Sequence, residues 1–94
     1  MSEIVRQVGE TKGRYVIRHD DGSESELTYS IMSPRAIIAD HTGVAEGHAR
    51  EGHGLRLVER LVADARAEGV KIVPLCPFVN AQRRRHPDWA DVFQ

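Results

Sequence analysis

The stretch GLRLVERLVADARAEGVKIV, residues 54–73, decides the fold class of this 94-residue chain. If residues 54–68 form a helix, charged side chains cover one of its faces. The other face is apolar, at the helical spacing of Leu55, Val58, Leu61, Val62 and Ala65. Gly69 stands where a glycine commonly ends a helix, and the β-branched run that follows over residues 70–73 predicts a strand. A helix followed directly by a strand indicates a helix that packs on a sheet.

The residues before this stretch predict strands. Three runs of alternating or β-forming residues are separated by turn signals and cover residues 14–19, 26–32 and 35–42. Asp21-Gly22 and Ser33-Pro34 provide the turns, because glycine tolerates positive φ and proline presets φ. Short turns between successive strands predict an antiparallel meander. A further strand over residues 4–8 is only weakly indicated.

Alternation within the third predicted strand places Ile37, Ala39 and His41 on one face. At the other end of the chain, Pro74, Pro77 and Pro87 interrupt regular pairing, so only a short helical segment is expected to follow. That segment carries Trp89 and Phe93, which either pack onto the sheet or meet a partner. The fold class predicted is α/β (α+β), as a single domain over residues 1–94.

The charge balance and the apolar content exclude several classes of protein. Thirteen Lys and Arg residues against fourteen Asp and Glu residues give a net charge of −1, so a strongly basic nucleic-acid-binding protein is excluded. No apolar run approaches the roughly 20 residues that span a bilayer, and the first residues lack the apolar stretch of a signal peptide. A single cysteine is typical of a reducing compartment. We expect a cytoplasmic monomer or weak homodimer that binds neither nucleic acid nor membrane.

Two short segments are candidates for chemistry. Residues 50–54 (REGHG) lie at the start of the predicted helix, where free backbone amides attract phosphate and glycines allow a close approach. A flexible loop without a ligand is the alternative interpretation. Cys76 lies at the carboxyl end of the last predicted strand, where active sites of α/β folds gather. A small buried apolar residue is the alternative there.

Histidines and arginines supply the remaining candidates. The spacing of His41, His48 and His53 matches no helical pair of metal ligands, so no metal site is predicted. His41, at a strand end, is a candidate general base or substrate contact, or else a structural histidine. Arg83-Arg84-Arg85 lies on a solvated helix face or contacts a phosphate group.

Taken together, residues 39–44 (ADHTGV), 52–54 (GHG), 74–79 (PLCPFV) and 86–89 (HPDW) resemble very short, YjdJ-type members of the GNAT superfamily of acetyl-CoA-dependent N-acetyltransferases. The resemblance runs from about Gly13 to Val92. In the superfamily, the loop that binds the cofactor's pyrophosphate begins with Gln or Arg, three positions before its first glycine. Ala49 occupies that position here, and Arg50 follows it.

The resemblance implies a GNAT-like fold: antiparallel N-terminal strands, a central helix packed on the sheet, a splayed pair of parallel strands and short C-terminal helices. It implies that the pantetheine arm of acetyl-CoA lies between the strands ending at Thr42 and Cys76, with the pyrophosphate at the helix N-terminus. The cofactor contacts it implies are Thr42, Val44, Arg50, Glu51, Gly52, His53, Gly54, Leu55, Pro77, Phe78 and Asn80.

The implied activity is acetyl transfer from acetyl-CoA to an amine acceptor. Cys76 and His41 are the implied catalytic residues: His41 would accept the amine proton, and Cys76 would either protonate the departing thiolate or carry the acetyl group itself. A non-catalytic CoA-binding or regulatory module of the same fold is an alternative, as is a small interaction domain that binds no cofactor.

Overall fold

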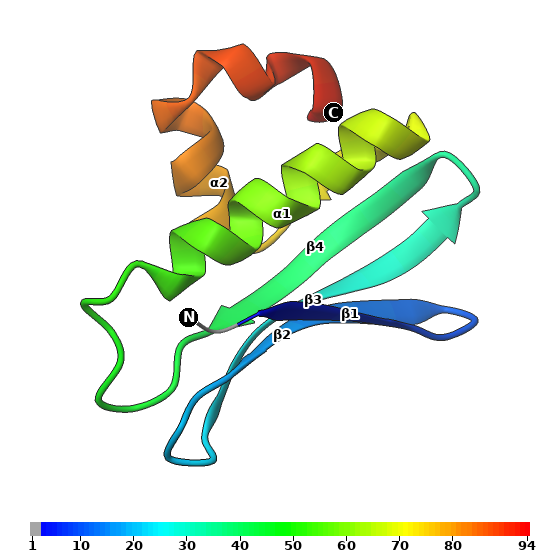
Figure 1. Ribbon diagram of the computed structural model, residues 1–94. Helices are drawn as coiled ribbons and strands as arrows, with labels where there is room; N and C mark the ends of the chain where they lie inside the picture. The colour runs from blue at the N-terminus through cyan, green and yellow to red at the C-terminus, as the bar shows by residue number, and fades with distance from the viewer. Residues whose placement is uncertain (1–2) are drawn as a thin grey trace.

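A twisted five-stranded sheet with helices on one side forms the molecule, and the computed structural model describes residues 3–94 (Figure 1). The elements are β1 (Ile4–Val8), β2 (Lys12–Arg18), β3 (Glu24–Ser33), β4 (Ala36–Gly43), α1 (His53–Glu68), β5 (Lys71–Pro74), α2 (Pro77–Arg85) and the 3-10 helix η1 (Pro87–Val92). The strands are ordered β1-β2-β3-β4-β5; β1 to β4 pair antiparallel, and β5 pairs parallel to β4. The predicted fold class and meander are confirmed, and residues 4–8 are indeed a strand.

The core lies between α1 and the sheet, with η1 and α2 closing it. Tyr15, Leu27 and Tyr29 of the sheet are at most 1% exposed and share one apolar cluster with the buried face of α1. That helix face differs from the predicted one at its start, since Leu57 is fully buried while Leu55 is only partly covered. The buried positions of α1 follow the 3.6-residue period from Gly54, which places Leu57 rather than Leu55 on the buried face.

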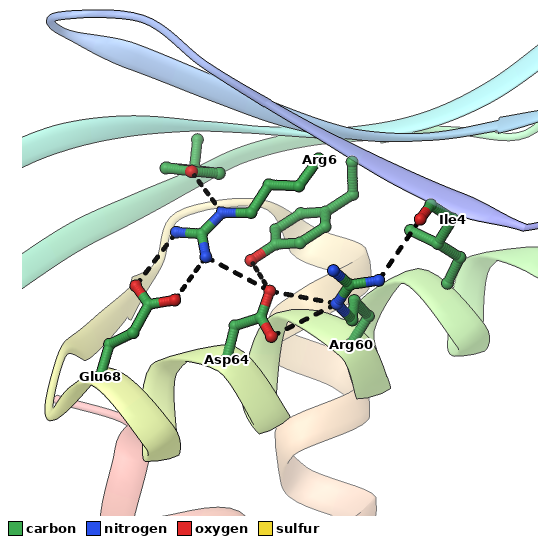
Figure 2. Close-up of polar contacts among 7 residues, drawn as sticks. Ile4, Arg6, Arg60, Asp64 and Glu68 are labelled. Carbon is green, nitrogen blue, oxygen red and sulfur yellow. Dashed lines mark hydrogen bonds and ion pairs between the residues drawn. The ribbon is translucent and has the colours of Figure 1, made fainter.

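A polar clasp joins the outer strand β1 to α1 (Figure 2). Arg6 donates to Glu68 and Asp64 of α1 and to the Tyr29 hydroxyl. Asp64 also accepts the Tyr15 hydroxyl at 2.9 Å. Burial raises the pKa of Tyr15, and the hydrogen bond to Asp64 raises it further. The clasp therefore positions an edge strand whose apolar side chains alone, exposed at Val5 and Val8, would hold it weakly.

An extra residue in β4 alters which side chains face the helices. Thr28 pairs with His41 and Tyr29 pairs with Ala39, so Asp40 is a β-bulge. The bulge reverses the alternation of side chains between the two faces of the sheet. His41, paired with Thr28, therefore lies on the face away from α1 and is exposed. The prediction that His41 shares a face with Ile37 and Ala39 is therefore wrong. Thr42, opposite the buried Leu27, takes that place.

The C-terminal residues pack against the sheet edge. Trp89 is 8% exposed and stacks on His86 with ring centroids 3.9 Å apart. Phe93 forms a bridge to Ile72 of β5, and the Gln94 amide donates to the Ile72 carbonyl at 2.9 Å. Packing onto the molecule is therefore the correct alternative for this segment.

Several predicted boundaries differ by one or two residues, as is usual at element ends. The largest differences are at β2 and β3, which each begin two residues earlier than predicted, at Lys12 and Glu24. β5 ends at Pro74, one residue later than predicted, with Pro74 paired to Ala39. Among residues 3–94, no helix is long and apolar enough to cross a membrane.

Candidate functional site

The parallel strands β4 and β5 separate before β4 ends. Their last paired residues are Ala39 and Pro74, whereas β4 continues to Gly43 and stays paired with β3 as far as Glu26. Residues 40–43 therefore have a strand neighbour on one edge only. The splay expected from the resemblance is present, and backbone groups on its open edge can pair with an extended ligand.

Cys76 lies where the two strands separate, between the end of β5 and the start of α2. Its amide donates to the Ala39 carbonyl at 2.8 Å, and its Sγ lies 3.4 Å from the Thr42 hydroxyl across the gap. The side chain is 3% exposed. Cys76 also caps α2, whose first residue is Pro77, so the positive end of the helix dipole is directed at the splay.

The N-terminus of α1 supplies free backbone amides. Gly52 caps the helix in the left-handed conformation with φ of 79°, without a side-chain cap, and no acidic residue lies in the first turn. The amides of residues 53–55 are the helix's unsatisfied donors. Arg50 is exposed and has no ion pair or hydrogen bond within residues 3–94. Such a site suits an anion.

Gly54 brings the starts of α1 and α2 together. A Cβ built on Gly54 would lie 2.7 Å from the Phe78 ring, so the ring packs where a side chain would otherwise stand. Two residues after Phe78, in the first turn of α2, the Asn80 amide donates to the Cys76 carbonyl, and the Asn80 side chain accepts from Arg83. The two helix N-termini thus converge beside the splay.

The structure does not place all the predicted residues around this gap. Thr42, Cys76, Pro77 and Phe78 gather there, and Val44 begins the loop to α1. His41 lies on the opposite face of the sheet.

A second group of polar residues gathers where the loop that precedes α1 meets the turn after β2. We refer to His19, His48, Glu51 and His53 as the histidine–glutamate cluster. The rings of His19 and His48 stack 3.9 Å apart, and Glu51 Oε1 lies 2.8 Å from both His48 Nδ1 and His53 Nε2. The side chains of Glu51 and His53 are thus directed at each other.

The cluster shifts several pKa values in opposite directions. Hydrogen bonds to Glu51 and to Asp21 raise the pKa of His48, and the bond with His48 lowers the pKa of Glu51. The pKa of Asp21 is lowered first by its hydrogen bond with Ser23 and then by the one with His48. Burial, with the charges of His48 and His53 nearby, lowers the pKa of His19.

Sequence reasoning missed two parts of these sites. The part played by Thr42 depends on the bulge at Asp40. His19 joins the cluster only because the turn after β2 folds against the loop before α1, 29 residues from His48 by number. The Asp-Gly turn signal beside His19 predicted the turn but not its neighbour.

Comparisons with known proteins agree with this geometry. The sequence model of the GCN5-related N-acetyl-transferase family matches residues 14–92. The solution structure of a GCN5-like candidate N-acetyltransferase from Staphylococcus aureus superimposes with a TM-score of 0.73 at 28% identity, covering 100% of this chain and 91% of that one. No curated protein matches the sequence. The chain belongs to the family of GCN5-related N-acetyltransferases.

Proposed function

We propose that this protein binds acetyl-CoA in the splay between β4 and β5 and transfers the acetyl group to an amine. The observation that carries the proposal is the unpaired end of β4, residues 40–43, facing Cys76. An extended pantetheine arm can hydrogen-bond to such a strand edge as a further strand does. Family membership supports the acetyl-transfer chemistry.

The N-terminus of α1 is the proposed pyrophosphate site. The amides of residues 53–55 supply the donors, and Arg50 supplies a cation in place of the side chain missing at Ala49. Val44 and Leu55 would border the arm, with Phe78 and Pro77 on the α2 side and Asn80 behind them. Glu51 and His53 contribute through their backbone, because their side chains are directed at each other.

We assign direct transfer as the mechanism. The neutral amine attacks the thioester carbonyl, the carbon–sulfur bond breaks, and the CoA thiolate takes a proton from Cys76. Thr42, whose hydroxyl lies 3.4 Å from Cys76 Sγ, holds the thiol in place. His41, exposed on the opposite face of the sheet, would accept the proton of an amine that approaches through the splay from that side.

Calorimetric titration with acetyl-CoA in the presence of EDTA tests the proposed binding, with ATP as a phosphate-bearing control. We expect saturable binding of acetyl-CoA and not of ATP. Equal binding of both, or binding of neither, would contradict the proposal. Turnover with a panel of amines then separates an enzyme from a non-catalytic CoA-binding module.

Two variants at Gly52 isolate the pyrophosphate contact. Gly52→Asp adds a negative charge beside the proposed pyrophosphate, and repulsion over about 5 Å predicts affinity weakened tenfold or more. Gly52→Asn adds similar bulk at the same positive φ without charge and should cost less than threefold. Equal affinities for acetyl-CoA in the two variants would remove this helix end from the site.

The role of Cys76 is tested by intact-protein mass spectrometry after mixing with acetyl-CoA. Direct transfer predicts no acetyl adduct on Cys76 and a slowed but measurable turnover in Cys76→Ala. An acetyl adduct in the wild type that is absent in Cys76→Ala, and that an amine removes, would establish the covalent route instead.

A further inference from the structure

The histidine–glutamate cluster joins three separate parts of the chain. His19 follows β2 and is 6% exposed, His48 and Glu51 come from the loop before α1, and His53 is the first residue of α1. One ligand atom from each of the four residues lies within 4.8 Å of the others. Ligands about 2.0–2.2 Å from a tetrahedral cation stand roughly 3.4 Å apart, so small side-chain rotations would close these four around one ion.

We propose that the histidine–glutamate cluster is a Zn²⁺ site that fastens the turn after β2 to the loop before α1. Three imidazole nitrogens and one carboxylate oxygen form a nitrogen-rich donor set that suits Zn²⁺ among the divalent cations. Four protein ligands complete a tetrahedron and leave no position for substrate, as in structural zinc sites. The proposal does not depend on acetyl-CoA binding.

Hydrogen bonds already gather three of the ligand atoms around one point. Glu51 Oε1 lies 2.8 Å from His48 Nδ1 and 2.8 Å from His53 Nε2. An ionised carboxylate can only accept, so both ring nitrogens donate protons to it. Zn²⁺ would take the place of both protons: the His48 proton leaves to solvent, and the His53 proton moves from Nε2 to Nδ1.

Outer partners orient the rings in the way zinc sites require. His48 Nε2 lies 3.0 Å from Asp21 Oδ2, so the nitrogen away from Glu51 is paired with a carboxylate. His19 Nε2 lies 2.8 Å from the hydroxyl of Ser25, which is fully buried. Histidine ligands of zinc commonly make such contacts through their second nitrogen.

The charges of the region also favour a divalent cation. The carboxylates of Asp21 and Glu51 would balance the charge of the bound cation. One existing contact has to break. Arg56 donates to His53 Nδ1 at 3.3 Å. With zinc on Nε2 the ring proton is on Nδ1, which can then no longer accept from Arg56. A surface hollow of about 360 Å³ gives access; it is lined by His19, Asp20, Asp21, His48, Glu51 and His53.

The test is a zinc titration of the full-length, untagged protein, in the absence of CoA, against a chromophoric chelator. We expect one Zn²⁺ per chain and a higher melting temperature in its presence. His48→Ala and Glu51→Ala, both at partly exposed positions, should weaken binding at least tenfold. His41→Ala removes an exposed histidine outside the cluster and should leave the zinc affinity unchanged.

Circular dichroism of each variant without metal shows whether it is folded, and Co²⁺ substitution reports the geometry through its visible absorption. A tetrahedral Co²⁺ spectrum in the wild type that is lost in His48→Ala supports the site. The proposal is overturned if the wild type shows no saturable zinc binding, or if folded His48→Ala and Glu51→Ala bind zinc as tightly as His41→Ala does.

Discussion

The Phe78 ring packs against Gly54 in the space that a Cβ would fill, and this contact fixes how the starts of α1 and α2 meet. Adding a Cβ at Gly54 would bring it 2.7 Å from the Phe78 ring, so Gly54→Ala has to displace a ring that is 37% exposed. We expect Gly54→Ala to lower the free energy of unfolding by about 1–2 kcal/mol, the usual cost of overpacking. Denaturant unfolding measures it.

The same substitution in a Phe78→Ala background is the matched control. With the ring gone, Gly54→Ala should become neutral or stabilising by about 0.5 kcal/mol, because alanine favours helix more than glycine does. A loss of the same size in both backgrounds would show that backbone strain, and not the ring, makes glycine necessary.

Helix α1 holds the outer strand β1 through Asp64, which accepts from Tyr15 at 2.9 Å, from Arg60 at 3.1 Å and from Arg6 (Figure 2). Asp64→Ala leaves the buried Tyr15 hydroxyl without its acceptor and the Arg60 guanidinium without a counter-charge, while Arg6 keeps its ion pair with Glu68. We expect a loss of about 2–3 kcal/mol in the free energy of unfolding, measured by denaturant titration.

Two variants on the same helix check this interpretation of Asp64. Asp64→Asn keeps an acceptor for Tyr15 and should cost about 1 kcal/mol. Glu59→Ala, on the exposed face of α1, should change stability by less than about 0.5 kcal/mol. If Asp64→Ala proved as mild as Glu59→Ala, the contacts of Asp64 would contribute nothing to holding β1 on α1.

At the scale of the whole molecule, the splay of β4 and β5 predicts where a cofactor changes backbone protection. Residues 40–43 lack a partner on the β5 side, so binding of acetyl-CoA there should slow amide hydrogen exchange in a peptide that covers them. Hydrogen-exchange mass spectrometry with and without acetyl-CoA measures this. The peptide over residues 4–8, at the far edge of the sheet, is the internal control. Saturable binding that left residues 40–43 unchanged would move the cofactor elsewhere.

The sequence by itself determined the order of the strands and of α1, whereas α2 was expected only from the resemblance. The 3.6-residue period of residues 54–68, the Asp-Gly turn and Gly69 are local signals, and each produced the element it predicted. Cys76 at the end of β5 and the glycines at the start of α1 followed from that order, because strand ends and helix starts position whatever residues they carry.

Only the tertiary structure decided which residues face the splay and which gather elsewhere. The bulge at Asp40 arises from the pairing of β4 with β3, and one extra residue reverses every side chain after it. This turned His41 away from Cys76 and put Thr42 beside it. The meeting of His19 with His48 and His53 likewise depends on how the turn after β2 packs against a distant loop. Local patterns carry periodicity, whereas register and long-range contact are set by the energy of the assembled sheet and core.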